Sequence, residues 1–325
     1  MKPTAVLLDV MPNQSRKAIS DRFEPHFDVR FAQSDDRGDL LRLVHGADVL
    51  LGMWGQIDAE LIASAKSAKV IQKLGVGVDK IDVDAAARQH VAVFKAAGIN
   101  ADAVAETAIL LTLAVSRNLM KAVRESRAGH FEKEVLRAET FQLTGKTFGL
   151  FGLGNIGQGV AKRLQAFGVD VIYTDVVRAP EAVEQASHAS FVSFDELLRR
   201  ADILSLHVPS TPETTGLFNR DTFAAMKQDA ILINTARGAL VNEDDLADAV
   251  RSGHILGAGL DVTVVEPLPA SSPLFDLERV IVTPHIAGAV GNNFPNVVSR
   301  AYDNVTSFLA GKTVRPEDVV TVPSD

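Results

Sequence analysis

The stretch that most constrains the fold is "TFGLFGLGNIGQGVAKRLQAFG", residues 147–168. It begins with an apolar run typical of a buried strand, passes through Gly152, Gly154 and Gly157, and continues directly into a helical pattern. The next apolar run, "VDVIYTD", ends at Asp175, 18 residues after Gly157. A strand, a G-x-G-x-x-G turn, a helix and a distant acidic residue in this order predict a dinucleotide-binding βαβ unit.

Each glycine has a separate expected role in such a unit. Gly152 makes the tight turn, Gly154 lets the backbone approach a pyrophosphate, and Gly157 lets helix and strand pack closely. The amides of Asn155 and Ile156, at the positive end of the helix, are expected to face the phosphates. The plainer alternative, a glycine-rich turn that binds nothing, does not account for the strand, helix and acid together.

Asp175 indicates which dinucleotide is bound. Its carboxylate can accept hydrogen bonds from the adenosine ribose hydroxyls and would repel a 2′-phosphate, which favours NAD over NADP. Arg178 leaves NADP open, because an arginine three residues further on could reach a 2′-phosphate.

Apolar runs and helical patterns alternate along most of the chain. Five strand-like runs in the first hundred residues predict a parallel sheet covered on both faces, with Asp39, Asp58 and Asp82 as helix N-caps. Residues 102–128 predict one long helix that is apolar around most of its first half. A second set of six strands follows, and residues 292–311 predict a terminal helix. The fold class predicted is α/β, with two doubly wound parallel-sheet domains: residues 1–98 with 289–325, and residues 99–288.

Composition excludes several classes of protein. The net charge of −8, without a cluster of basic residues, argues against nucleic-acid or anionic-membrane binding. The amino terminus meets Asp9 too early for a signal peptide, and no apolar run is long enough to span a membrane. The absence of cysteine excludes disulfides and thiolate chemistry and fits a reducing compartment. We expect a cytoplasmic protein without a metal site.

Polar residues follow four successive strand-like runs of the second set. They are His207, Arg237, Asp261 (with Glu266 five residues on) and His285. Because parallel strands end at one edge of the sheet, these side chains are expected to meet where the dinucleotide binds. Taken singly, His285 could be a loop residue, and Arg237 with Glu266 a salt bridge joining two loops.

Together these groups fit one reaction. A histidine can protonate the oxygen of a carbonyl that receives hydride, and a carboxylate such as Glu266 would fix its tautomer. The fork of Arg237 matches a substrate carboxylate. The combination predicts interconversion of a 2-oxo acid and a 2-hydroxy acid.

The whole chain resembles the D-isomer-specific 2-hydroxyacid dehydrogenase family. The resemblance rests on the glycine turn and on "GVGVDKIDV" (75–83), "VAETAILLTLAVSRN" (104–118), "LHVPSTPETTGLF" (206–218), "INTARGALVNEDDL" (233–246), "GLDVTVVEP" (259–267) and "TPHIAG" (283–288). It implies a flavodoxin-like substrate domain formed by both chain ends, an inserted Rossmann NAD domain, a D-2-hydroxy acid product and a homodimer through the NAD domains.

The resemblance also implies roles for individual residues. Arg237, Glu266 and His285 would be catalytic, Asp261 would hold the nicotinamide carboxamide, and the amides of Val76 and Gly77 would bind the substrate carboxylate. The remaining implied contacts with the cofactor are those of His207, Val208, Pro209, Thr214, Thr235, Ala236, Arg237, His285 and Gly288. Trp54, Arg237 and His285 are also implied to contact the substrate.

Several residues depart from the family's pattern. Thr107 stands where many members have histidine, and Thr263 where an aromatic residue is common. The loop with Gly52 and Trp54 lacks the arginine frequent in members that act on phosphoglycerate, although Lys73 could help to bind a phosphate. The regulatory domain of longer phosphoglycerate dehydrogenases is also expected to be absent.

We therefore expect reduction of glyoxylate, hydroxypyruvate or a similar acid. Two alternatives stay open: a phosphoglycerate dehydrogenase of serine synthesis, and a non-catalytic NAD(H)-sensing binding protein.

Overall fold

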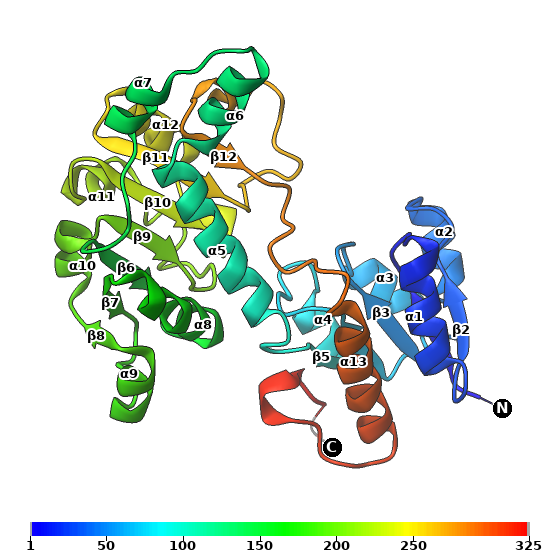
Figure 1. Cartoon of the computed structure of the whole chain (residues 1–325). Coiled ribbons are helices and arrows are strands. Elements are labelled where there is room, and N and C mark those ends of the chain that lie inside the picture. Colours follow the sequence, from blue (N-terminus) through cyan, green and yellow to red (C-terminus); the bar gives the residue numbers. More distant parts are fainter. Residues whose placement is uncertain (1, 324–325) are drawn as a thin grey trace. The chain divides into compact units, whose positions relative to one another are not determined.

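The computed structural model describes residues 2–323 and divides the chain into two compact units (Figure 1). One unit contains Met1–Asn100 and Val290–Asp325, and the other contains Ala101–Ala289. Each has its own sheet, in the orders β13-β5-β4-β3-β1-β2 and β12-β11-β10-β9-β6-β7-β8. The predicted α/β class with two doubly wound sheets is confirmed.

The first unit has the strand order of a flavodoxin-like fold, with one added edge strand. Its strands are β1 (Thr4–Leu7), β2 (Asp28–Phe31), β3 (Val49–Gly52), β4 (Val70–Lys73), β5 (Ala92–Phe94) and β13 (Val319–Thr321). Its helices are α1 (Asn13–Phe23), α2 (Arg37–Leu43), α3 (Ala59–Ser64), α4 (Val83–Arg88), α13 (Phe294–Leu309) and the short η4 (Pro316–Asp318).

Strand β13 corrects the expectation of a wholly parallel sheet. It pairs antiparallel with β5, whereas the other strand pairs of this sheet are parallel. A three-residue strand more than 220 residues from its partner carries too little local pattern to be predicted.

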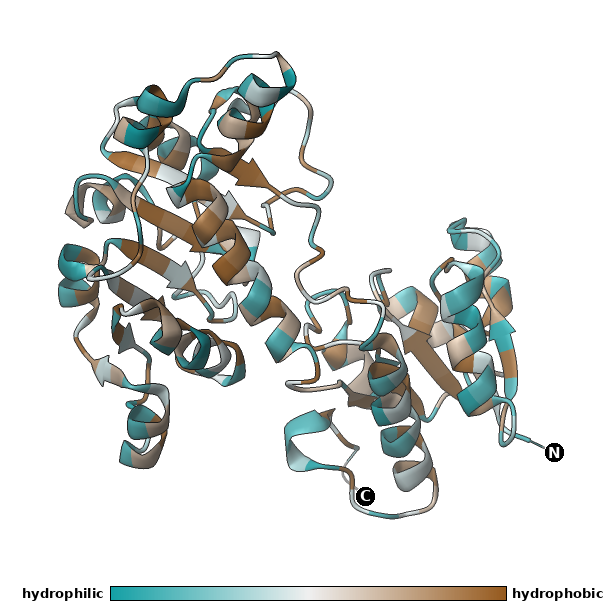
Figure 2. Ribbon diagram, viewed as in Figure 1, coloured by the Kyte–Doolittle hydropathy of each residue, from teal (hydrophilic) through white to brown (hydrophobic). Residues whose placement is uncertain are grey.

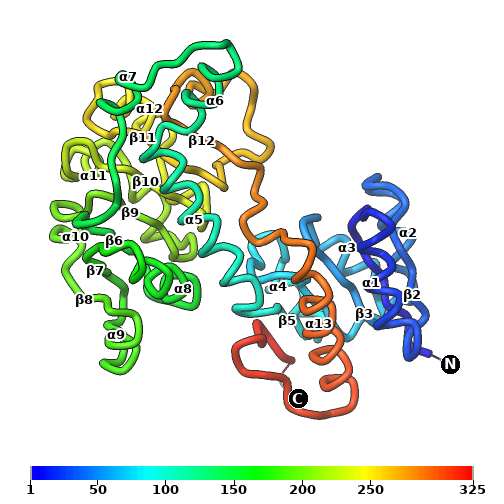
Figure 3. The backbone as a smooth tube through the Cα atoms, in the orientation of Figure 1, coloured from blue at the N-terminus to red at the C-terminus, as the bar shows by residue number. Residues whose placement is uncertain are grey.

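Alternating side chains of the first sheet enter two cores. Leu7 and Leu51 pack with α1 and α13, while Val6 and Leu50 pack on the opposite face with α3 and α4. The tube in Figure 3 shows the carboxyl-terminal helix α13 beside α1, although the two are far apart in the sequence. The return of the chain thus completes one face of this unit.

The second unit has Rossmann order, extended by one strand. Its strands are β6 (Thr147–Phe151), β7 (Asp170–Thr174), β8 (Ala189–Phe191), β9 (Ile203–Leu206), β10 (Ala230–Asn234), β11 (Ile255–Leu260) and β12 (Val280–Val282). Its helices are α5 (Ala101–Ser116), α6 (Leu119–Arg127), α7 (Lys133–Glu139), α8 (Asn155–Leu164), α9 (Glu181–Ser187), α10 (Phe194–Arg200), α11 (Arg220–Ala225) and α12 (Glu243–Arg251), with η1 (Gln165–Phe167), η2 (Gly238–Leu240) and η3 (Pro273–Asp276). The six expected strands are present, and the short edge strand β8 is an addition.

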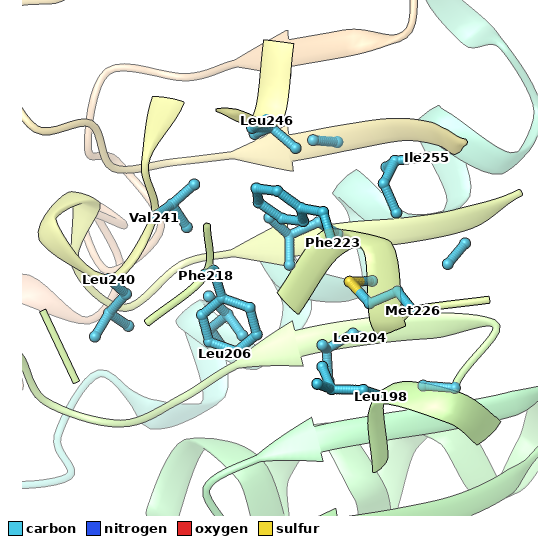
Figure 4. Close-up of a cluster of buried hydrophobic side chains, with 14 of the residues drawn as sticks. Leu198, Leu204, Leu206, Phe218, Phe223, Met226, Leu240, Val241, Leu246 and Ile255 are labelled. Atoms are coloured by element: carbon cyan, nitrogen blue, oxygen red, sulfur yellow. The ribbon is translucent and has the colours of Figure 1, made fainter. Parts of the chain in front are cut away.

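Helices cover both faces of this sheet, as a parallel sheet requires. Ile231 and Ile233 face α5 and α8, whereas Leu232 between them joins the opposite core of α10, α11 and α12. Figure 4 shows that second core, with Phe218 and Phe223 beside Leu204 and Leu206. The brown strands inside each unit in Figure 2 reflect this double burial.

The single helix expected over residues 102–128 is wrong. α5 and α6 are separate and bent by 61°, because Asn118 adopts a left-handed backbone conformation with φ of 46°. Asparagine tolerates this conformation better than most residues do, and its side chain donates to Glu139 at 2.9 Å. The break turns α6 away from the sheet that buries α5.

One of the three predicted N-caps is also wrong. Asp58 and Asp82 accept the amides of Leu61 and Ala85 and cap α3 and α4 as expected. The cap of α2 is Asp36, which accepts the amide of Asp39 at 3.0 Å. The helix begins at Arg37, so Asp39 lies inside its first turn.

Among the described residues, no single helix is long and apolar enough to cross a membrane. The bent pair α5 and α6 meets the length and composition requirements only when the two are taken together.

Candidate active site

The glycine turn lies at the point where the strand order of the second sheet reverses, between β6 and β9. Gly152 has φ of +103°, which favours glycine, and a Cβ there would lie 2.9 Å from the His207 carbonyl oxygen. A Cβ on Gly157 would lie 2.3 Å from the Gly152 carbonyl oxygen. Both glycines are therefore required by the packing of the turn itself.

Gly154 differs, because a Cβ on it would meet no protein atom within 4 Å. It precedes α8, whose first turn has no side-chain cap. The amides of Asn155 and Ile156 belong to this first turn and have no acceptor within the helix. Open space beside an uncapped ten-residue helix fits a dinucleotide pyrophosphate.

Two alanine substitutions separate these roles. Gly157→Ala is expected to lower the free energy of unfolding by about 1–3 kcal/mol, because its Cβ overpacks against backbone. Gly154→Ala is expected to leave stability unchanged and to weaken NADH binding, since its methyl would enter only the open space. Denaturant unfolding and NADH fluorescence titration check both, and equal effects of the two variants would contradict the assignment.

Asp175 joins the end of β7 to the glycine turn. Its carboxylate accepts the amides of Leu153 at 2.9 Å and Val176 at 2.8 Å. Both oxygens keep lone pairs with which they could bind ribose hydroxyls. Arg178, which left NADP open, is paired with Glu184.

The chain after β9 supplies further predicted cofactor residues. A Cβ on Gly152 would lie 2.8 Å from Val208, so this loop packs directly on the glycine turn. Thr214 closes the loop by donating its hydroxyl to the Pro209 carbonyl at 2.9 Å. The imidazole Nε2 of His207 lies 2.9 Å from the Ser205 hydroxyl, and burial lowers the pKa of His207 to about 3. His207 is therefore neutral at physiological pH.

Two buried polar atoms beside this turn have no hydrogen-bond partner among the described residues. They are Nδ1 of His207 and the hydroxyl oxygen of Thr235. Because buried polar groups are nearly always satisfied, such atoms at the carboxyl ends of β9 and β10 fit the contact surface of a polar ligand.

The structure brings His285 and Glu266 together. Nδ1 of His285 lies 2.9 Å and 3.1 Å from the two carboxylate oxygens of Glu266. The side chains are 52% and 33% exposed, so both are accessible. Because the carboxylate accepts from Nδ1, the ring nitrogen that remains for proton transfer is Nε2.

Asp261 holds the loop that carries His285. It is 1% exposed and accepts the Thr283 hydroxyl at 2.6 Å and the amides of Ile286 and Ala287 at 3.0 and 2.8 Å. His285 itself has φ of +52°, and its amide donates to the Asp261 carbonyl at 2.8 Å. The Asp261 carboxylate thus positions His285, a role that the sequence did not predict; its contact with a carboxamide stays a prediction.

The loop with Arg237 is fixed by residues on either side of it. Buried Asn234 accepts the Ala236 amide at 3.0 Å and donates to the Arg237 carbonyl at 2.9 Å. A Cβ on Gly238 would lie 2.0 Å from the Thr263 carbonyl carbon. The Arg237 loop therefore packs tightly against the backbone of the loop that leads to Glu266.

Asn234 and Gly238 were missed as site residues. Both stand in the motif "INTARGALV", and a polar asparagine at the end of an apolar strand was the signal that could have identified Asn234.

Thr263, where an aromatic residue is common, closes the neighbouring loop. Its hydroxyl donates to the Val265 carbonyl at 2.9 Å, and its amide lies 3.3 Å from a Glu266 oxygen.

Thr107 connects α5 to the loop after His285. Its hydroxyl lies 3.1 Å from the Ala103 carbonyl and 3.4 Å from the Ala287 carbonyl. Gly288, a predicted cofactor residue, follows Ala287 in the same loop.

The predicted substrate residues Trp54, Val76 and Gly77 belong to the first unit, in the loops after β3 and β4. Asp9, buried after β1, accepts the amides of Met53, Trp54 and Gly55 at 2.5, 3.0 and 2.7 Å. Lys73 donates to the Met53 carbonyl. These bonds hold the loop while leaving the Trp54 residue 47% exposed.

We expect Asp9→Asn to lower the free energy of unfolding by about 1–3 kcal/mol, because an amide nitrogen would face backbone donors that need acceptors. Denaturant unfolding measures the loss. Asp35→Asn, at an exposed position, is the matched control, and equal stability of the two variants would contradict the prediction.

A family model matches most of the second unit. Residues 109–287 match the model of the D-isomer specific 2-hydroxyacid dehydrogenase, NAD binding domain. The prediction of NAD as cofactor is confirmed by this match.

Two relatives span nearly the whole chain. A D-3-phosphoglycerate dehydrogenase of Mycobacterium leprae is 41% identical over 96% of this chain, which covers 58% of that relative's length. A glyoxylate reductase of Thermococcus litoralis is 36% identical, with 96% of this chain and 95% of that protein covered.

A solved structure has the same architecture. The TT0316 protein of Thermus thermophilus superposes with a TM-score of 0.87 at 38% identity, covering 98% of this chain and 100% of that one. With the glycine turn, the His285–Glu266 pair and these matches, the chain belongs to the D-isomer-specific 2-hydroxyacid dehydrogenase family.

Proposed function

We propose that this protein catalyses the NAD-dependent interconversion of a 2-oxo acid and a D-2-hydroxy acid. The observation that carries the proposal is the His285–Glu266 pair, 2.9 Å apart in the same unit as the glycine turn. A histidine oriented by a carboxylate is a suitable proton donor and acceptor for a carbonyl oxygen. The D configuration follows from the family.

Each residue of the candidate site has a separate role in this reaction. NADH, when bound, supplies the hydride. The Glu266 carboxylate holds Nδ1–H of His285, so that protonated His285 can give the Nε2 proton to the oxygen of the reduced carbonyl. The guanidinium of Arg237 binds the substrate carboxylate through parallel hydrogen bonds. The Asp261, Asn234 and Thr263 contacts keep these loops in place.

We propose glyoxylate, hydroxypyruvate or a similar small acid as the substrate. The similarity to a glyoxylate reductase, of which this chain covers 95%, supports this choice. The 41% identity to a D-3-phosphoglycerate dehydrogenase favours the second candidate, a phosphorylated substrate. Trp54, Val76 and Gly77 stay predicted substrate residues.

The test is loss of NADH absorbance with a panel of 2-oxo acids that includes glyoxylate, hydroxypyruvate, pyruvate and phosphohydroxypyruvate. Preferential turnover of an unphosphorylated acid supports the proposal, and preference for phosphohydroxypyruvate supports the second candidate. NADH binding without turnover of any acid would contradict both and support the NAD(H)-sensing alternative.

We also propose a homodimer formed through α5, α6 and the segment before α7. Leu110, Leu119, Met120 and Phe131 are exposed there, and Phe131 is 92% exposed. Large exposed apolar side chains are typical of an interface where they form a continuous patch. Sedimentation equilibrium should give twice the chain mass, and Phe131→Asp should lower the measured mass.

The cytoplasmic location stays a prediction from the sequence.

A further inference from the structure

Arg178 is the feature of the cofactor site that the proposed reaction does not use. It lies three residues after Asp175, close to where a nicotinamide cofactor's adenosine ribose would bind. An arginine at this place could bind the 2′-phosphate that distinguishes NADP from NAD. Whether it does so depends on what already holds its guanidinium.

Glu184, from helix α9, binds the Nε–Nη2 edge of the Arg178 guanidinium. Nε and Nη2 of Arg178 donate to the two Glu184 oxygens, each at 2.9 Å. This is the parallel, two-bond geometry in which arginine binds a carboxylate most strongly. The Glu184 side chain is 11% exposed and that of Arg178 is 65% exposed, so the carboxylate is the fixed partner.

Tyr173 fixes the Glu184 carboxylate in turn. Its hydroxyl donates to a Glu184 oxygen at 2.6 Å and accepts the Ala179 amide at 2.9 Å. Burial, together with the bond to Glu184, raises the pKa of Tyr173, so its hydroxyl stays protonated. The bonds from Arg178 and Tyr173 lower the pKa of Glu184 to about 2, and the carboxylate therefore stays charged throughout the physiological range.

The surroundings allow the guanidinium to move if it is released. It lies 5.8 Å from the centre of the Phe191 ring, and Arg178 and Glu184 border an open hollow of about 740 Å³. The hollow is also lined by Glu181, whose carboxylate accepts from Gln185 at 3.0 Å. Because the Phe191 ring is a weak contact and the hollow is open, the bonds to Glu184 are the principal restraint on the Arg178 guanidinium.

We propose that Glu184 enforces NAD selectivity by binding the Nε–Nη2 edge of Arg178 and holding the guanidinium beside α9, so that a 2′-phosphate meets the Asp175 carboxylate without an arginine to neutralise it. The inference rests on the cofactor site assigned above. It makes Glu184 a selectivity residue that acts through Arg178 and does not itself touch the cofactor.

The test uses two ligands that differ in the 2′-phosphate, 5′-AMP and 2′,5′-ADP, with calorimetric titration of the full chain. Glu184→Gln is expected to bind 2′,5′-ADP about tenfold more tightly than the unmodified protein, which corresponds to about 1.4 kcal/mol. Binding of 5′-AMP should stay the same. The ratio of kcat/KM for NADPH to that for NADH should rise in parallel.

Three variants make the result specific. Glu181→Gln removes an equal charge from the same hollow and should give no gain in affinity for 2′,5′-ADP. This result would separate the Glu184–Arg178 ion pair from a general effect of charge. Glu184→Gln combined with Arg178→Gln should lose the gain. Arg178→Gln alone should leave the ratio of 2′,5′-ADP to 5′-AMP affinity unchanged, because Glu184 already holds the Arg178 guanidinium; this variant does not depend on the folding of Glu184→Gln.

The proposal is overturned if Glu184→Gln binds 5′-AMP normally without gaining affinity for 2′,5′-ADP. It is also overturned if Glu181→Gln gives the same gain, or if Arg178→Gln alone weakens 2′,5′-ADP binding selectively. Failure of the unmodified protein to bind 5′-AMP would instead reject the cofactor site itself. Thermal melting of each variant identifies any loss of folding.

Discussion

His285→Ala is expected to lower kcat by about 10²–10⁴-fold, the usual size of a general acid–base contribution. The substitution removes the proton donor that Glu266 orients through Nδ1. NADH binding should persist, because the glycine turn and the amides of α8 are untouched. Steady-state kinetics with the preferred 2-oxo acid, together with NADH titration, separate these two effects.

His254→Ala is the matched control for this prediction. His254 lies just before β11, at the opposite end of the strand from Asp261, and its Nε2 is 3.2 Å from the Met226 carbonyl. Its loss should leave kcat unchanged. A decrease smaller than about tenfold in His285→Ala would contradict the proton-donor role.

Gly238→Ala is expected to lower kcat/KM by at least about 10²-fold, because displacement of reacting groups by about 1 Å has this effect. The new Cβ would lie 2.0 Å from the Thr263 carbonyl carbon and 2.5 Å from the Val264 amide nitrogen. Backbone atoms on both sides must shift, and the shift separates the Arg237 loop from the loop of Glu266. Kinetics and thermal melting should be measured on the same preparation.

Gly291→Ala provides the same chemical change without a clash, because a Cβ there meets nothing within 4 Å. It should match the unmodified protein in stability. Normal kcat/KM in Gly238→Ala would show that the two loops tolerate movement and would reject the tight coupling proposed for them.

Much of the site was predictable because its signals are local. The apolar run before Gly152, the glycine spacing and the distance to Asp175 all follow from the geometry of one βαβ unit. His285 and Glu266 were predicted as partners because they follow neighbouring parallel strands, which end at one edge. The sequence could not predict that Asp261 anchors the His285 loop, because that role depends on three donors more than twenty residues away.

In the fold, too, some elements were predictable from local sequence and others were not. The strands with long apolar runs were predicted, whereas β8 and β13, with three residues each at sheet edges, were not. The break at Asn118 was hidden within a continuous helical pattern, because the left-handed conformation of Asn118 and its bond to Glu139 are tertiary features. The sequence predicted Asp39 as a cap because an acidic residue precedes an apolar run, but Asp36 is equally suitable, and the helix begins after it.

The sequence by itself determined the two α/β sheets, the dinucleotide turn and the polar residues at the strand ends. Apolar periodicity and glycine spacing encode these features within a few dozen residues. Only the tertiary structure decided which groups bind one another: Glu266 binds His285, Asp261 binds the loop that carries His285, and Glu184 binds Arg178. Such pairings depend on distances of about 3 Å between segments, which are set by the packing of the whole unit and not by local pattern.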